Sequence, residues 1–387
     1  MNNPFSTLPK PAPDPIFSIA LEARKAGPEA IDATAGVYMG EDGTPHLLPS
    51  VSNALREYGT TLHEEDISYP PLLGLPGYRK IVEDLVFGAS TSVNIASIAT
   101  TGGTGALAVN LRLMKQIHSD ITIILPTPAW ANHMPLCKAA NTDAKEVPCI
   151  ENGEVTEAPL VRAIQDCTTP SAVLLQAGCH NPTGRDFSLS QLDAVLDVVR
   201  EKECMVLMDF AYQGFAGTPE KDAMPIQRCI DANVPLFVTW SASKNHGLYG
   251  LRTGLACAVA PDKEAKTIVE NHYSMISRGL HSSAPVMGQA VVEITQKKNN
   301  ALWLNDLQTI RDTLQGKRKN LAQALPEQFT APLMGTGMFA LLPLTIDQIR
   351  SLRTQHKVFM TEDGRINIGG IPMKRIDELA AKILQVI

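Results

Sequence analysis

Short apolar runs alternate with amphipathic stretches from residue 46 to about residue 295. Six of these runs have the length and composition of buried strands, at residues 95–99, 121–125, 172–176, 205–208, 236–240 and 255–259. Between two of them, apolar residues recur at helical spacing behind a predicted N-terminal cap at Ser190. Alternating strands and helices are typical of a mainly parallel sheet covered by helices on both faces, so we predict an α/β fold.

The pattern changes near residue 300. Residues 300–325 contain no proline and place their leucines and isoleucine roughly on one stripe, which predicts a long helix. Shorter elements follow, predicted as a β-like segment, a helix, a second β-like segment and a final amphipathic helix at residues 338–342, 345–355, 365–368 and 376–384. This mixture indicates a smaller α+β unit after the large one.

We therefore divide the chain into three parts. Residues 46–310 form the predicted large domain, and residues 16–45 with 311–387 form the predicted small domain. Prolines stand at nearly every second position from residue 9 onward, which predicts that residues 1–15 are extended and similar to polyproline. This segment is either a frayed tail or an arm that lies on a partner subunit.

Composition excludes several classes of protein. The net charge of −6 argues against a general nucleic-acid surface, and no segment is long and apolar enough to span a membrane. The 7 cysteines are scattered and never spaced as C-x-x-C, which is typical of reduced thiols in a cytoplasmic protein. The 9 histidines form no metal-binding motif, so we predict no metal.

Small and polar residues follow the apolar run at 236–240. Lys244 lies there among serines and glycines, and Arg252 follows eight residues later. Ligands of α/β proteins bind at such strand ends, and a cofactor that carries both a phosphate and an aldehyde would suit these two cations. The alternative is a solvated loop with two surface cations.

A glycine-rich segment at residues 101–106 lies between a predicted strand and a predicted helix at 107–117. Its backbone N–H groups could bind a phosphate at the start of the helix. The same residues also match the dinucleotide pattern G-x-G-x-x-A, but the next strand ends in Pro126 and Thr127 and lacks the acid that binds a ribose. A plain tight turn is the third interpretation.

Other candidate residues follow three further strands. Asp209 comes directly after the run at 205–208, where an unpaired carboxylate would be costly, and a protonated heteroaromatic nitrogen would be a suitable partner. Tyr212 could donate to an oxygen of the same ring, unless Asp209 merely caps the next segment. Asn181 lies in a turn with Pro182, which directs the Asn181 side chain above the sheet. Trp130 follows another strand and either stacks on a cofactor or belongs to the core.

Five motifs occur in one order at compatible spacings: Gly-Gly-Thr-Gly, Asn-Pro-Thr-Gly, Asp-Phe-Ala-Tyr-Gln-Gly-Phe, Ser-x-Ser-Lys-Asn and Gly-Arg-Ile-Asn. In these motifs the chain resembles the aspartate and aromatic aminotransferases among the fold-type-I pyridoxal-phosphate enzymes. The resemblance covers the chain from about residue 15 to the end. It implies pyridoxal 5'-phosphate as cofactor, bound by the large domain, and a homodimer.

The resemblance also implies a role for each matching residue. Lys244 would bind the cofactor covalently and carry a proton, and Asp209 would keep the pyridine nitrogen protonated. Tyr212 and Asn181 would bond the ring's 3-oxygen, and Trp130 would cover the ring. The phosphate ligands implied are Gly103, Thr104, Ser241, Ser243, Arg252 and, from the other subunit, Tyr69.

Two arginines match the residues that bind the substrate in the family. Arg365 would hold the α-carboxylate, and Arg278 of the neighbouring subunit would hold a side-chain carboxylate. Without the resemblance, Arg278 would be interpreted as a surface cation on a helix. The remaining substrate-binding residues implied are Gly36, Trp130 and Asn181.

The chain also departs from the family near these residues. Gln176 stands where relatives usually carry a histidine, and Leu280, Ser282 and Ser283 replace a stretch richer in asparagine. We predict a cytoplasmic aspartate aminotransferase that transfers the amino group to 2-oxoglutarate by a ping-pong mechanism. The alternatives are an aromatic amino acid aminotransferase, a pyridoxal-phosphate lyase or decarboxylase, and a non-enzymatic regulator with this fold.

Overall fold

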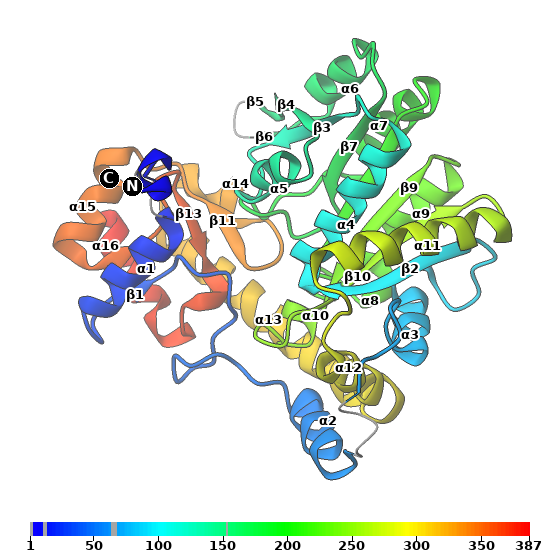
Figure 1. Ribbon diagram of the computed structural model, residues 1–387. Helices are drawn as coiled ribbons and strands as arrows, with labels where there is room; N and C mark the ends of the chain where they lie inside the picture. Colours follow the sequence, from blue (N-terminus) through cyan, green and yellow to red (C-terminus); the bar gives the residue numbers. More distant parts are fainter. Residues whose placement is uncertain (1–2, 11–13, 63–67, 152–153) are drawn as a thin grey trace.

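The central feature of the molecule is a seven-stranded sheet with the order β2-β10-β9-β8-β7-β3-β4 (Figure 1). The computed structural model describes residues 3–10, 14–62, 68–151 and 154–387. Strand β10 runs antiparallel to both neighbours, and the other paired strands are parallel. The strands are β2 Asn94–Thr101, β3 Thr122–Thr127, β4 Asp143–Pro148, β7 Ser171–Gln176, β8 Met205–Phe210, β9 Leu236–Ser241 and β10 Thr253–Ala260.

The six predicted strands are all present, whereas the prediction missed β4 at the edge of the sheet. Every residue of β8 is buried, as expected for a strand covered on both faces. In β4 most positions are exposed, and Asp143, Lys145 and Glu146 make the strand charged. Charged side chains are common on edge strands because they discourage pairing with other chains. Since β4 therefore lacks an apolar run, the hydrophobic pattern of the sequence did not predict it.

Helices cover both faces of the sheet. Successive strand residues point to opposite faces, so Val206 packs with one core cluster and Leu207 with the other. Helices α4 and α11 contribute to the Leu207 face, and α7, α12 and α13 to the Val206 face. The helices of this region are α2 Pro49–Thr60, α3 Pro76–Phe87, α4 Gly102–Ile117, α5 His133–Ala139, α6 Ala158–Gln165, α7 Leu189–Glu201, α8 Pro219–Asp222, α9 Met224–Asp231, α10 Ala242–Asn245, α11 Lys263–Leu280 and α12 Val286–Lys298.

A third core cluster joins both ends of the chain, away from the central sheet (Figure 1). Here β1 pairs with β12 and β11 pairs with β13, so Ile31 packs beside the C-terminal helices. This packing is compatible with the predicted small domain, whose boundaries stay a prediction. The elements are α1 Pro15–Lys25, β1 Ile31–Asp32, α13 Asn300–Ala324, α14 Thr330–Leu333, β11 Phe339–Leu341, α15 Ile346–His356, β12 Val358–Phe359, β13 Arg365–Asn367 and α16 Ile376–Leu384, while β5 Ile150–Glu151 and β6 Glu154–Val155 form a separate small sheet.

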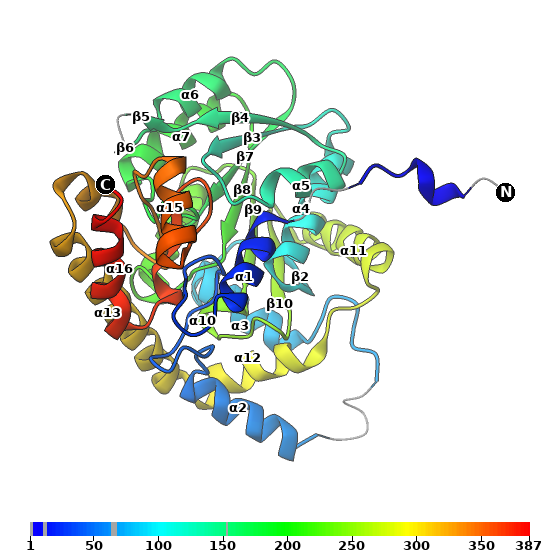
Figure 2. The same cartoon turned by 90° about the vertical axis from the view of Figure 1, so that its left-hand side faces the viewer.

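Three local predictions were wrong. The segment Pro4–Thr7 is a short 3₁₀ helix (η1) instead of extended chain, because the Asn3 side chain accepts a hydrogen bond from the Phe5 N–H group and proline suits a first turn. Figure 2 shows η1 apart from the rest of the chain; residues 1–2 and 11–13 lie outside the described residues. The cap of α7 is Ser188, which forms a capping box with Gln191, and not Ser190.

The third correction concerns α4, which begins at Gly102 and not at residue 107. The glycine-rich segment is therefore the first turn of the helix. Because the first N–H groups of a helix have no partner inside it, this start places free donors directly after β2. Within the part of the chain that the structure describes, no helix is long and apolar enough to cross a membrane.

Candidate active site

One pocket lies where the carboxyl ends of β7 and β8 meet the first turn of α4 and two residues of the small β11–β13 sheet, Phe339 and Arg365. It brings together every predicted site residue except Tyr69 and Arg278. Parallel strands present their carboxyl ends at one edge of the sheet, which explains how distant motifs converge. The pocket is lined by Ile16, Gly36, Gly103, Thr104, Leu107, Trp130, Gln176, Asn181, Asp209, Ala211, Tyr212, Ser241, Ser243, Lys244, Arg252, Phe339 and Arg365.

Lys244 lies in the single turn of α10, directly after β9. Its Nζ atom is 5.3 Å from the centre of the Tyr212 ring. Burial lowers the pKa of Lys244 from its ordinary 10.5 to about 8, although the nearby Asp209 carboxylate acts in the opposite direction. A substantial share of this amine is therefore neutral near pH 8, and a neutral amine is the form that attacks a carbonyl carbon.

This lowered pKa predicts how the protein reacts with an aldehyde. Only the neutral amine attacks, so the rate of covalent attachment of pyridoxal phosphate to the cofactor-free protein should rise with pH. The expected midpoint is near pH 8, because the pKa of Lys244 is about 8. Stopped-flow absorbance measures this rate. A rate that continues to rise to the ordinary lysine pKa, without a midpoint near pH 8, would contradict the assignment.

A buried histidine supports Asp209, and the sequence analysis gave this residue no role. His133 Nε2 lies 2.9 Å from Asp209 Oδ2, and Thr239 Oγ1 donates to Asp209 Oδ1 at 3.3 Å. His133 is 1% exposed and its ring meets Trp130 edge-on. The available signal was the spacing of His133 three residues after Trp130, within one turn of chain, which puts both rings beside the same strand end.

A second group of lining residues is suited to an anion. Gly103 and Thr104 lie in the first turn of α4, where backbone N–H groups are free and the helix dipole favours negative charge. Arg252 donates to Ser243 Oγ at 3.3 Å, and the Ser241 hydroxyl donates to the same oxygen at 3.0 Å. The group therefore combines one guanidinium, two hydroxyls and a helix start, which matches the needs of a phosphate.

Arg365 reaches the pocket from β13. Its Nη1 donates to Asn181 Oδ1 at 3.3 Å, its Nη2 donates to the Thr34 carbonyl at 2.7 Å, and its guanidinium carbon lies 5.0 Å from the centre of the Phe339 ring. Its Nε has no hydrogen-bond partner among the described residues. Burial lowers the pKa of Arg365, so the charged form is held at a cost that a bound carboxylate would offset.

Two predicted residues lie outside this pocket. Tyr69 is 91% exposed. Arg278 is exposed in the last turn of α11. Neither residue lines the pocket of its own chain. Their role across a dimer interface stays a prediction.

Comparison with known proteins identifies the family. The family model described as aminotransferase class I and II matches residues 28–383. The chain belongs to this aminotransferase family. It is 28% identical over 400 residues to aspartate aminotransferase 1 of Medicago sativa and covers 95% of that protein; the alignment spans 99% of this chain. It is 30% identical over 400 residues to tyrosine aminotransferase of Klebsiella pneumoniae, covering 99% of this chain and 100% of that protein.

A solved structure agrees with the family assignment. The aromatic amino acid aminotransferase of Burkholderia pseudomallei, solved covalently bound to pyridoxal phosphate, superposes with a TM-score of 0.94 at 26% identity, over 99% of both chains. The predicted fold and enzyme class are therefore confirmed: the protein is a pyridoxal-phosphate-dependent aminotransferase of fold type I. The dinucleotide interpretation of residues 101–106 was wrong, because the glycines form the first turn of α4 in an aminotransferase.

The pocket fits this cofactor on its own chemistry. A lysine amine with a lowered pKa suits the aldehyde, a buried carboxylate suits the ring nitrogen, and the start of α4 suits the phosphate. These three groups come from three separate strand ends. Because all three groups line one pocket, the aminotransferase assignment is chemically consistent.

Proposed function

We propose that this aminotransferase exchanges the amino group of aspartate with 2-oxoglutarate, giving oxaloacetate and glutamate by a ping-pong mechanism. The observation that carries the proposal is a single pocket that joins Lys244, at the end of β9, to the buried Arg365 of β13. An arginine whose Nε has no hydrogen-bond partner in the described part of the chain can bind the α-carboxylate of an amino acid beside a reactive amine. A steady-state panel of aspartate, tyrosine, phenylalanine and alanine with 2-oxoglutarate tests the proposal.

The cofactor supplies an electron sink for the negative charge that forms at the substrate Cα atom. Asp209, fixed by His133 and Thr239, would keep the ring nitrogen protonated. Tyr212 and Asn181 would donate to the 3-oxygen of the ring, and burial raises the pKa of Tyr212, so that its phenol keeps its proton for this bond.

Lys244 would hold the cofactor and, once its amine is free, move the proton between the substrate Cα atom and the cofactor. Its lowered pKa suits both tasks, since an acid–base group works best when its pKa lies near the working pH. Gly103, Thr104, Ser241, Ser243 and Arg252 would anchor the phosphate. Trp130 would lie over the ring, and Gly36, which has no side chain, would leave room beside the substrate.

We further propose a cytoplasmic homodimer in which each pocket receives Tyr69 and Arg278 of the other subunit. The exposure of both side chains in the single chain supports this arrangement. Arg278 would then bind the side-chain carboxylate of aspartate. A fully active monomer would contradict it.

An aromatic amino acid aminotransferase is the second candidate. Ile16, Trp130 and Phe339 give the pocket an apolar wall that an aromatic side chain could contact. The relatives of this chain include both kinds of enzyme, at similar identity. A lyase or decarboxylase has less support, because the family is that of aminotransferases.

Replacing Arg278 by leucine separates the two candidates. Arg278→Leu should lower kcat/KM for aspartate by about 10- to 150-fold, the loss expected for a charged hydrogen bond to a carboxylate. The value for phenylalanine should change little, because its side chain carries no charge. Arg200→Leu removes an exposed arginine from α7 and is the matched control. Equal losses for aspartate and phenylalanine would contradict the role of Arg278.

A further inference from the structure

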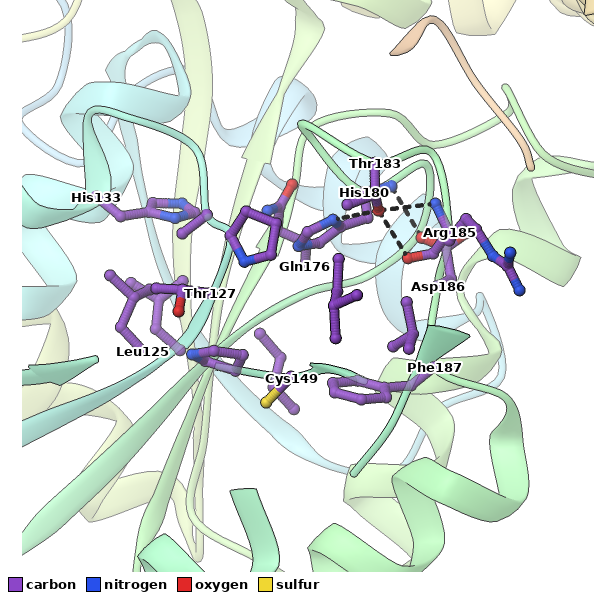
Figure 3. Close-up of a pocket in the computed structure, with 17 residues that line it drawn as sticks. Leu125, Thr127, His133, Cys149, Gln176, His180, Thr183, Arg185, Asp186 and Phe187 are labelled. Atoms are coloured by element: carbon purple, nitrogen blue, oxygen red, sulfur yellow. Dashed lines mark hydrogen bonds between the residues drawn. The ribbon is translucent and has the colours of Figure 1, made fainter. Parts of the chain in front are cut away.

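A second pocket lies against the cofactor pocket, and Gln176 lines both of them. Figure 3 shows this second pocket, with Gln176 near its middle, His133 on one side, and Thr183 and Asp186 on the other. Gln176 is the last residue of β7, so its backbone is part of the rigid sheet. The side chain thus stands between the sheet and the turn that carries Asn181.

The Gln176 side chain makes two hydrogen bonds to one residue. Its Nε2 donates to the Asn181 carbonyl at 2.9 Å, and its Oε1 accepts from the Asn181 backbone N–H at 2.9 Å. The primary amide thereby satisfies both backbone groups of a buried residue, as a neighbouring strand would. Two hydrogen bonds of opposite direction fix the position and orientation of the Asn181 backbone.

The backbone around Gln176 is tied to Asp209 on the other side. Gln176 pairs with Asp209 in the β7–β8 ladder, and the Ala177 N–H donates to the Asp209 carbonyl at 2.9 Å. A single short segment therefore connects the two residues proposed to hold the ring nitrogen and the ring oxygen. Beyond Asn181 the connection continues, because Asn181 Oδ1 accepts from Arg365 Nη1.

We propose that Gln176 is a positioning residue, which holds the Asn181 side chain at a fixed place between Asp209 and Arg365. The inference rests on the proposed function, since it assigns Asn181 the bond to the ring oxygen. Gln176 itself acts through Asn181. Because an amide does not titrate, the two bonds to Asn181 persist across the working pH range.

Replacing Gln176 by methionine removes both hydrogen bonds and retains a side chain of similar length. An Asn181 that is no longer aligned donates less well to the ring oxygen, so the anionic form of the ring is less favoured. The visible absorption band of the cofactor-loaded protein changes with pH, and the pH at which half of this change is complete is its midpoint. This midpoint should rise by about half to one pH unit. The value of kcat/KM should fall about tenfold for aspartate and for phenylalanine alike. The reason is that Asn181 would bind the cofactor ring and Arg365 the α-carboxylate, which are common to both reactions.

The matched control is Gln191→Met. Gln191 is also half-buried, donates to the Val155 carbonyl at 3.0 Å and accepts from the Ser188 N–H at 2.9 Å, at the surface start of α7. Its loss should lower the melting temperature and leave the absorption midpoint unchanged. Gln176→Glu keeps the size and one of the two bonds, and it should shift the midpoint in the same direction as methionine, since it loses the donor and adds negative charge.

A double-mutant cycle with Asn181→Ala separates the role of Asn181 at the ring oxygen from the role of Gln176 in positioning Asn181. Asn181→Ala alone should raise the midpoint, and Gln176→Met should add little in that background, because Gln176 acts through Asn181. A normal midpoint in Asn181→Ala would overturn two proposals, the bond from Asn181 to the ring oxygen and the positioning role of Gln176. A raised midpoint in Asn181→Ala, together with an unchanged midpoint in Gln176→Met and Gln176→Glu, would overturn the Gln176 proposal alone.

Discussion

Replacement of Lys244 by alanine should lower kcat for transamination by about 10⁴-fold or more. General acid–base catalysis alone contributes about 10²- to 10⁴-fold, and this variant loses both the proton carrier and the covalent attachment of the cofactor. No second amine can substitute, because Lys244 is the only lysine among the described residues that line the pocket. Single-turnover absorbance with aspartate measures the loss.

Lys317→Met is the matched control for this experiment. Lys317 is fully buried and burial lowers its pKa, but its Nζ lies over the Tyr38 ring at 5.6 Å, on helix α13 and outside the pocket. The control removes a buried lysine amine without touching the site, so its kcat should remain near that of the unaltered enzyme. If Lys244→Ala kept activity in the range of this control, the assignment of Lys244 would be wrong.

Replacement of Asp209 by alanine should have the second-largest effect, a fall in kcat of about 10²- to 10³-fold or more. The carboxylate is 8% exposed and is held by His133 and Thr239, so it is preorganised to stabilise positive charge on the ring nitrogen. Without Asp209, nothing would keep the ring nitrogen protonated in this way, and the cofactor would supply a weaker electron sink. Kinetics at saturating cofactor distinguish this loss from weaker cofactor binding.

Asp222→Asn provides the comparison for Asp209. Asp222 is a buried carboxylate at the end of helix α8, outside the pocket, and it accepts from the Gly214 N–H at 2.7 Å and the Ala216 N–H at 3.2 Å. Its replacement should lower the melting temperature and leave kcat almost unchanged. Similar kcat values for Asp209→Ala and the unaltered enzyme, with cofactor bound, would show that Asp209 does not control the ring.

The sequence predicted most of the site because the site is built at strand ends. Lys244, Asp209 and Asn181 each follow a recognisable apolar run, and parallel strands bring such positions to one edge of the sheet. Edge strand β4 was missed because its exposed, charged residues lack an apolar run. Periodicity reports burial, so it detects the covered strands and overlooks the exposed one.

Contacts between distant segments could not be predicted from local patterns. Arg365 meets Asn181 across 184 positions and meets Thr34 across 331, and neither spacing carries a local signal. The two bonds from Gln176 to Asn181 span only five residues, yet they depend on how the turn folds after β7. For Gln176, the sequence showed only a departure from the family, whereas the structure shows its partner.

The role of Lys244 is tested most directly by reducing the cofactor-loaded enzyme with borohydride and locating the modified lysine by peptide mass spectrometry. Reduction makes the bond between the cofactor and its lysine permanent. We predict the cofactor on the peptide that contains Ser243, Lys244 and Asn245, with the modification on Lys244. Modification of another lysine, such as the buried Lys317, or an enzyme that transaminates without any modified lysine, would contradict it.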